Sequence, residues 1–323
     1  MKPKKILIIR NDHIGDMILT TGIFRELKKE FPNSELTVIV SKANRSMIEN
    51  NLNVDEILVA DHGKKLLKNW KGYPKLWKKI KNKNFDIGID LRGDFLNIFF
   101  LMFLTRVRKR IGLHKGRLSK LFLDYGRIRD IKKHEIQNMF DVVNEGLGIN
   151  LKNLKPEIFV SNSDRKDLSE LIKKNKLKKF ICVCPDASHP LRLLPLEEFD
   201  KIIKYVRKKY PEYKIIIPGV SERVDFLVKK NPGAISLKFA NLKMLYLLFQ
   251  KAGVVLSLDT GTTPLSWAGD SNLINILLKL SVRTLDHLKP LSKNAVVVWE
   301  KDKPLKAEDI MPEVDKFLNK ERK

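Results

Sequence analysis

Two segments of this chain, residues 6–32 and 257–269, share one order of features: an apolar run, a short polar turn, and a helix-forming stretch. A strand that enters a helix through such a turn is the unit of a doubly wound parallel sheet. The Gly, Thr and Asp residues of the turn point backbone N–H groups, and the positive end of the helix, toward the sheet edge. One such unit in each half predicts two Rossmann-like domains that face each other across a cleft.

Apolar runs that predict strands alternate with helix-forming segments along both halves of the chain. A length of 323 residues is enough for two hydrophobic cores. The pattern restarts after residue 162, which predicts an N-terminal domain of residues 1–162 and a C-terminal domain of residues 163–323. In the first half, residues 43–50 are expected to be helical and residues 106–133 irregular. The strands expected there cover residues 4–10, 35–40, 56–60, 85–90 and 157–161.

The composition indicates a soluble globular protein with a strong basic excess, since the formal net charge is +25. Such an excess favours an anionic partner, which is a nucleic acid, an acidic lipid surface or a phosphorylated substrate. The alternative is that the lysines only cover solvated faces. The sequence contains no zinc-finger, RNA-recognition or helix-turn-helix pattern, so a nucleic-acid-binding module is the weaker alternative.

Several signatures of cofactor and metal chemistry are missing. No G-x-G-x-x-G follows the first strand, and neither a phosphate-binding G-x-x-x-x-G-K-[ST] loop nor a G-x-S-x-G turn occurs. The two cysteines, Cys182 and Cys184, alternate within one expected strand, and the six histidines lack the spacing of metal ligands. We therefore expect chemistry without a metal or a bound cofactor.

The segments that address a chain to a membrane are also not recognisable. The first ten residues carry too short an apolar run for a signal peptide, and reduced cysteines fit a cytoplasmic protein. The longest apolar run, residues 95–104, is far below the ~20 residues needed to cross a bilayer. We expect a cytoplasmic protein that acts as a monomer.

Two basic segments suggest contacts with anionic groups. Residues 64–83 carry nine lysines and no acid, interleaved with Trp70 and Trp77. This pattern predicts either a membrane-surface contact or a helix that packs its apolar face inward. The second basic segment, at residues 106–120, is expected beside the cleft, where it would contact phosphates or carboxylates of an anionic lipid-linked acceptor.

Four segments, in the same order, resemble the bacterial heptosyltransferase family, glycosyltransferase family 9. They are IRNDHIGDMILTTGIFRELKKEFP, FDIGIDLRGD, PDASHPLRLLPLEEF and SLDTGTTPLSWAG. The resemblance implies an α/β protein of GT-B type. It also implies a metal-independent transfer, with inversion, of heptose from ADP-heptose to the inner core of lipopolysaccharide.

The resemblance also implies roles for single residues. Asp16, the acid of the Gly-Asp pair, corresponds to the general base. Ser188 and Arg192 correspond to donor phosphate contacts, and Glu222 to the acid that contacts the nucleotide ribose. Asp259 corresponds to a contact with the donor sugar. The turn that binds the diphosphate contains Thr260, Gly261 and Thr263. The residues expected to bind the acceptor are Asp12, Gly15, Arg92, Arg106, Arg110, Lys115 and Arg117.

Two positions depart from the family pattern. Pro264 stands where the family usually has His, and Leu194 stands where it usually has Trp before a Pro. Both positions lie in segments that contact the donor. The departures keep two alternatives open, namely transfer from a different nucleotide sugar and a degenerate member that binds a sugar nucleotide without turnover.

Overall fold

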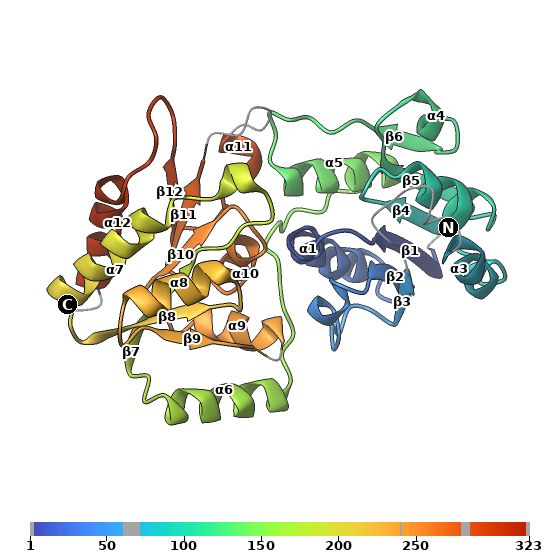
Figure 1. Ribbon diagram of the computed structural model, residues 1–323. Coiled ribbons are helices and arrows are strands. Elements are labelled where there is room, and N and C mark those ends of the chain that lie inside the picture. Colours follow the sequence, from blue (N-terminus) through green and yellow to red (C-terminus); the bar gives the residue numbers. More distant parts are fainter. Residues whose placement is uncertain (1–2, 61–71, 240, 279–284, 321–323) are drawn as a thin grey trace. The chain divides into compact units, whose positions relative to one another are not determined.

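The chain folds into two compact units, Met1–Phe159 and Val160–Lys323. The computed structural model describes residues 3–60, 72–239, 241–278 and 285–320. Each unit contains one six-stranded sheet in which all strand pairs are parallel. Helices flank each sheet (Figure 1). The predicted class, α/β with two doubly wound parallel sheets, is confirmed.

The sheet of unit 1 has the strand order β3-β2-β1-β4-β5-β6. The order reverses between β1 and β4, and ligands of open parallel sheets bind beyond the carboxyl ends of strands at such a switch point. The strands are β1 Lys5–Arg10, β2 Glu35–Ser41, β3 Glu56–Ala60, β4 Ile87–Asp90, β5 Lys109–Leu113 and β6 Tyr125–Arg127. The helices are α1 Ile14–Glu30, the 3₁₀ turn η1 Arg45–Met47, α3 Gly72–Ile80, the π-helical η2 Asn97–Phe103, α4 Arg117–Lys120 and α5 Glu135–Leu147.

Three expectations for unit 1 are wrong. Residues 106–133 are not irregular, because they form β5, α4 and β6. The predicted helix at 43–50 is reduced to η1, since Asn44 bonds instead to the Arg10 carbonyl and the Ser41 N–H. Residues 157–161 add no strand. The Glu157 N–H donates to the Thr21 hydroxyl of α1, which ties this extended segment to a helix and not to the sheet.

Only part of the lysine-rich segment 64–83 can be placed, since residues 61–71 lie outside the described residues. In α3, the side chains of Tyr73, Leu76 and Ile80 are buried in the core of unit 1, and Lys75, Lys78 and Lys79 are exposed. The described part of the segment therefore packs its apolar face inward.

The sheet of unit 2 has the order β12-β11-β10-β7-β8-β9, with its switch point between β7 and β10. Its core is built from the apolar strands and from the inner faces of α7 and α12. The strands are β7 Lys179–Cys184, β8 Tyr213–Pro218, β9 Ile235–Leu237, β10 Val255–Leu258, β11 Leu273–Leu277 and β12 Ala295–Trp299. The helices are α6 Asn162–Lys174, η3 Pro190–Arg192, α7 Leu196–Lys209, α8 Glu222–Lys230, α9 Leu242–Phe249, α10 Thr262–Ala268, α11 Leu285–Leu288 and α12 Ala307–Lys320.

Candidate active site

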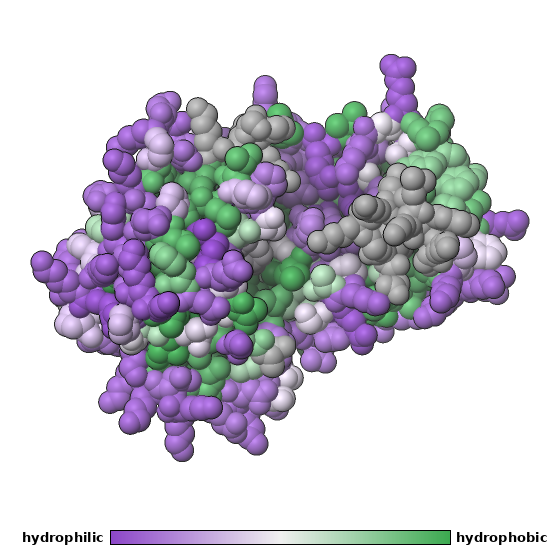
Figure 2. Space-filling view, in the orientation of Figure 1, coloured by the Kyte–Doolittle hydropathy of each residue, from purple (hydrophilic) through white to green (hydrophobic). Residues whose placement is uncertain are grey.

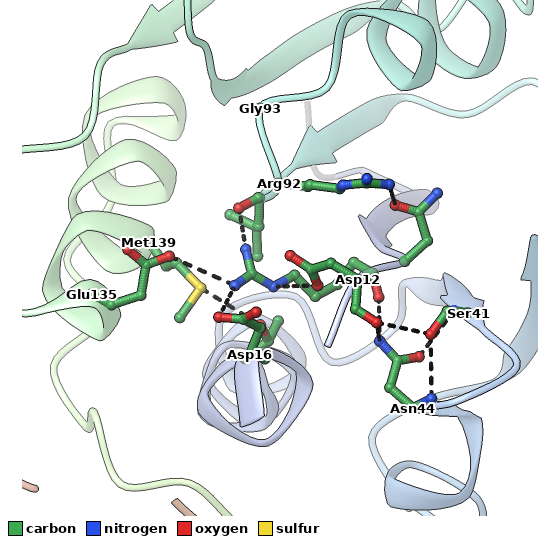
Figure 3. A network of polar contacts seen from close by, with 12 residues as sticks. Asp12, Asp16, Ser41, Asn44, Arg92, Gly93, Glu135 and Met139 are labelled. Carbon is green, nitrogen blue, oxygen red and sulfur yellow. Dashed lines mark hydrogen bonds and ion pairs between the residues drawn. The ribbon is translucent and has the colours of Figure 1, made fainter. Parts of the chain in front are cut away.

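Polar side chains of unit 1 gather where β1 and β4 end (Figure 3). The two strands are neighbours, with Ile9 paired to Asp90, so their carboxyl ends lie side by side. The chain leaves β1 through Asp12 and enters α1, whose first turn contains Gly15 and Asp16. The structure thus brings the acids predicted from the strand ends to one edge of the sheet.

Arg10, the last residue of β1, lies at the centre of this cluster and is fully buried. Its guanidinium contacts Asp12 at 3.2 Å and Asp16 at 2.9 Å, and it donates to the Leu91 carbonyl. It also lies 3.6 Å from Glu135. Burial acts to lower the pKa of Arg10, but the surrounding carboxylates outweigh it and raise that pKa above its ordinary value.

Asp16 differs from Arg10 in being partly open to solvent. Its Oδ1 pairs with Arg10 Nη2, while 30% of its side chain remains exposed. A carboxylate that is fixed on one side and accessible on the other can accept a proton from a bound molecule. Its place in the first turn of α1 also sets its negative charge against the positive end of the helix.

Glu135, the first residue of α5, links this cluster to a second arginine. Its Oε1 lies 3.1 Å from Arg129 Nε. Arg129 in turn donates to the carbonyls of Leu91 and Arg92 at 2.9 and 3.2 Å. The chain of contacts fixes α5 against the loop that follows β4.

The loop after β1 is held by side chains from the β2 end. Ser41 Oγ donates to the Asp12 carbonyl at 2.9 Å, and Asn44 donates to the carbonyls of Arg10 and Asp12. Burial raises the pKa of Asp12, and the negative charge of Asp16 adds to this, whereas Arg10 acts against it. These contacts fix the backbone that precedes Asp16.

Asp90 organises the turn after β4. Its carboxylate accepts from the N–H groups of Arg92 and Gly93, and from Asn97 Nδ2 at 2.9 Å. Complete burial raises its pKa from 3.8 to about 6. Gly93 has φ +77, a conformation that favours glycine. The Arg92 side chain then reaches the residue that follows β1, where it donates to Asn11 Oδ1 at 3.2 Å.

The second basic segment is divided between the amino ends and the carboxyl ends of the strands. The expectation that all of it lies beside the site is therefore wrong. Arg106 and Arg110 lie at the amino end of β5, because Lys109 pairs with Ile87 at the start of β4. Arg110 also bonds to Asp124 and to two carbonyls. Lys115 and Arg117 follow the carboxyl end of β5, on the edge where β4 ends, and both are exposed.

In unit 2, Arg192 and Asp259 meet at the carboxyl ends of the central strands. Arg192 closes η3 after β7, and Asp259 follows β10 directly. Arg192 Nη1 lies 3.2 Å from Asp259 Oδ2 and donates to the Asp259 carbonyl at 3.3 Å. The structure therefore joins two residues that the sequence placed 67 positions apart.

Hydroxyl groups form a continuous chain beside this pair. Thr262 Oγ1 lies 2.6 Å from Ser257 Oγ and 2.7 Å from Thr260 Oγ1. Thr263 is buried and bonds to the Leu258 carbonyl at 2.9 Å. Gly261 precedes α10 and shares this turn. Of the predicted donor residues, Thr260 and Gly261 are part-exposed, whereas Thr263 is buried inside the turn.

The end of β8 forms a second tight turn in unit 2. Gly219 has φ +134, and a Cβ there would lie 3.3 Å from Asp186. Asp186 accepts from the Ser221 hydroxyl at 2.7 Å, and Ser221 caps α8. Glu222 is therefore the first residue of a capped helix and is exposed. The other predicted residue of this edge, Ser188, is also exposed.

The departures from the family pattern fit the structure without strain. Pro264 lies in the first turn of α10, where a helix tolerates proline because its N–H is not needed. Leu194 is fully buried in the core of unit 2.

Sequence reasoning missed Arg10 and Glu135. The signal for Arg10 was a charged residue that ends the apolar strand Lys5–Arg10, since a buried arginine requires paired carboxylates. Glu135 gave no such signal, because Arg10, which it contacts in this cluster, lies 125 residues away in the chain.

Among the described residues, no group of three or more His, Cys, Asp or Glu side chains is arranged to bind a metal ion. Within the same residues, no helix combines the length and the apolar character that a membrane crossing requires.

Comparison with known proteins gives consistent matches. The profile of glycosyltransferase family 9 (heptosyltransferase) matches residues 73–315. The lipopolysaccharide core heptosyltransferase OpsX of Haemophilus influenzae is 24% identical over 268 residues, which cover 80% of this chain and 74% of that protein. The structure of a family 9 glycosyl transferase from Veillonella parvula has a TM-score of 0.86 at 19% identity, covering 98% of this chain and 97% of the other. For the ADP-heptose lipopolysaccharide heptosyltransferase II of E. coli, the TM-score is 0.81 at 16% identity, with 99% and 100% covered.

Two doubly wound parallel sheets in one chain, each with polar residues at the carboxyl ends of its central strands, define a protein of the GT-B fold. The family profile spans more than half of the chain, and the protein belongs to glycosyltransferase family 9, the heptosyltransferase family. The resemblance drawn from the four sequence segments is confirmed.

Proposed function

We propose that this enzyme transfers heptose from ADP-heptose to the inner core of lipopolysaccharide, with inversion at the anomeric carbon and without a metal ion. Two relatives support the substrate class, since one is a lipopolysaccharide core heptosyltransferase and another is named for ADP-heptose. The observation that carries the mechanism is the carboxylate of Asp16, which is fixed by Arg10 on one side and open to solvent on the other.

In this mechanism Asp16 is the general base. Its carboxylate takes the proton of the acceptor hydroxyl while that oxygen attacks the anomeric carbon of the donor. The new C–O bond forms on the face opposite the phosphate, and the bond between the anomeric carbon and the phosphate oxygen breaks. ADP leaves with the electron pair. A single displacement of this kind inverts the configuration.

The donor residues are assigned to unit 2. Arg192 and Ser188 contact the phosphates, and the turn of Thr260 and Gly261, supported by Thr263 beneath it, binds the diphosphate. The positive guanidinium stabilises the negative charge that grows on the departing ADP, which removes the need for a metal ion. The remaining donor contacts are Glu222 with the ribose and Asp259 with a sugar hydroxyl.

The acceptor residues are assigned to unit 1. Asp12, Gly15 and Arg92 lie at the same strand ends as Asp16, and the exposed Lys115 and Arg117 contact anionic groups of the acceptor. The proposal includes a monomeric enzyme. The lipid-linked acceptor places the enzyme at the cytoplasmic face of the membrane, in contact with its surface.

A second candidate is favoured by Pro264 and Leu194, which stand where the family usually has His and Trp. In this candidate the protein transfers a different sugar, or binds a sugar nucleotide without transfer. A screen of nucleotide sugars for a rise in melting temperature separates ADP-heptose from a different donor, because only bound ligands stabilise the folded protein. The transfer assay described below separates transfer from binding alone. We expect the largest rise with ADP-heptose.

The decisive experiment compares Asp16→Asn and Asp16→Ala with the wild type in a heptose-transfer assay. We expect both variants to lose about 10²–10⁴-fold in turnover, the usual contribution of a general base. The melting shift caused by ADP should stay unchanged, because the residues assigned to ADP binding lie in unit 2. A loss below about tenfold with intact ADP binding would reject Asp16 as the base.

A further inference from the structure

Large apolar side chains that are exposed to solvent concentrate in one stretch of unit 1. Phe103, Leu118 and Leu121 are 41%, 58% and 78% exposed. The same stretch is basic, since residues 103–129 contain nine Lys and Arg and a single acid, Asp124. An apolar patch ringed by one sign of charge marks an interaction surface.

The helix α4 presents this character most clearly. Leu118 within the helix and Leu121 directly after it both face solvent, and only Ser119 of the helix is buried. Lys115, Arg117 and Lys120 are exposed around them. Figure 2 shows hydrophobic surface over α4, at the upper right, beside hydrophilic side chains. Since α4 contributes no apolar side chain to the core, packing within the protein does not explain why its leucines are apolar.

Aromatic side chains support this helix from below. The ring of Phe122, which follows Leu121, packs on Phe103 at 4.9 Å and on Phe99 at 5.1 Å. Arg110 lies over the Phe103 ring and pairs with Asp124, which neutralises the one acid of the stretch. The exposed leucines therefore lie beside a packed cluster of aromatic side chains.

The segment also begins beside the acceptor edge of unit 1. A Cβ at Gly93 would lie 3.3 Å from the Leu113 carbonyl, so the turn that follows β5 packs against the turn after Arg92. A molecule bound along α4 thus lies next to the loops that contain the assigned acceptor residues.

We propose that Phe103, Lys115, Arg117, Leu118, Lys120 and Leu121, here called the α4 surface, contact an anionic lipid bilayer. The apolar side chains enter the boundary between headgroups and acyl chains, and the cations contact anionic headgroups. Nucleic acid fits less well, because phosphate contacts and base stacking give the exposed leucines no role. The inference deepens the proposed function and rests on it for the lipid-linked nature of the acceptor.

The test uses the purified full chain and sedimentation with sucrose-loaded vesicles. One set of vesicles is phosphatidylcholine, and the other contains about 30% phosphatidylglycerol. We expect binding to the anionic vesicles that weakens as salt rises from about 0.05 M to about 0.5 M. The double variant Leu118→Ser/Leu121→Ser should bind about tenfold more weakly. The matched control is Leu52→Ser, because Leu52 is 84% exposed and precedes β3, at the opposite edge of the sheet from β6.

Four results of the binding assays would overturn the proposal. These are no retention of the wild type on anionic vesicles, equal retention of the double variant, an equal loss in Leu52→Ser, and retention by RNA but not by vesicles. A dimer that the double variant dissociates would also overturn it, since a second copy would then cover the leucines. Melting shifts with ADP and transfer to a delipidated acceptor are measured in parallel. If these fail while vesicle binding persists, the proposed function fails and the α4 surface stands.

Discussion

Asp16 Oδ1 lies 2.9 Å from Nη2 of Arg10, so the carboxylate that we assign as the base is bound to a cation that is itself fully buried. The guanidinium cannot move, because it also contacts Asp12 and donates to the Leu91 carbonyl. This arrangement fixes the direction in which the remaining oxygen of Asp16 can accept a proton. The buried end of β1 therefore determines the geometry of the site.

Replacing Arg10 by Met is expected to lower the free energy of unfolding by about 3–5 kcal/mol, because it leaves buried carboxylates without their counter-charge. Denaturant unfolding of the purified variant measures this. The control is Arg108→Met, since Arg108 pairs with Asp86 at 3.1 Å but is 70% exposed. Its loss should stay within about 1 kcal/mol. Equal losses of unfolding free energy in both variants would show that the buried ion pairs of Arg10 stabilise the protein no more than an exposed pair does.

Arg10→Lys separates stability from positioning. Lysine keeps the charge but lacks the planar fork that contacts several acceptors at once. We expect a folded protein whose transfer rate falls tenfold or more, while its affinity for ADP is unchanged. A rate equal to that of the wild type would mean that Arg10 supplies only charge.

The position of the acids could be inferred from the sequence, but their partner could not. Asp90 ends one apolar strand, Asp12 lies two residues beyond another, and Asp16 lies in the first turn of the helix that follows. The rule that strand ends line a site needs only this local pattern. The pairing of Arg10 with Glu135 depends on where α5 packs, and no local pattern encodes that contact. Arg10 was visible only as a charge at the end of a buried strand.

The strands β5 and β6 show why part of the fold escaped prediction. β5 begins with Lys109 and Arg110, and β6 contains only three residues, so neither has the apolar run that marks a buried strand. Their structure comes from pairing with β4 and with each other, since tertiary context overrides weak local preference. The same error placed Arg106 and Arg110 at the wrong edge.

The buried carboxyl of Asp90 is expected to make stability depend on pH. Its pKa is raised from 3.8 to about 6, so the folded protein keeps a proton that the unfolded chain releases. The folded state binds more protons in this window, and the free energy of unfolding therefore falls as pH rises through it. Asp90→Asn removes this contribution. Relative to the wild type, its free energy of unfolding should rise by up to about 3 kcal/mol between about pH 4 and about pH 7.

Denaturant unfolding at several pH values checks this prediction. The exposed Asp302→Asn serves as the control, and it should follow the wild-type profile. Parallel profiles for Asp90→Asn and the wild type would contradict the assignment of a raised pKa to Asp90.

On the donor side, Arg192→Ala should weaken the binding of ADP by about tenfold to a hundredfold, because charged hydrogen bonds contribute about 1.5–3 kcal/mol. Isothermal calorimetry measures the affinity. Arg165, which is exposed on α6 in the same unit, provides the control Arg165→Ala, with an affinity equal to that of the wild type. Unchanged ADP binding in Arg192→Ala would remove Arg192 from the phosphate site.

The packing of α5 on the sheet gives the last prediction. Gly146 lies in α5, and a Cβ built there would lie 2.6 Å from Ile111 Cγ2 of β5. Alanine in a helix interior normally stabilises by roughly 0.5–1 kcal/mol, but here the overlap should reverse the sign and destabilise by about 1–3 kcal/mol. Because α5 carries Glu135 to Arg10, the transfer rate should fall as well.

Gly116→Ala is the matched control for Gly146→Ala, since a Cβ at Gly116 meets no atom within 4 Å and its backbone is extended. Its free energy of unfolding should stay within about 0.5 kcal/mol of the wild type. If Gly146→Ala stabilises the protein instead, the contact between α5 and β5 is looser than described. The path from α5 through Glu135 to the Asp16 carboxylate would then lose its rigid support.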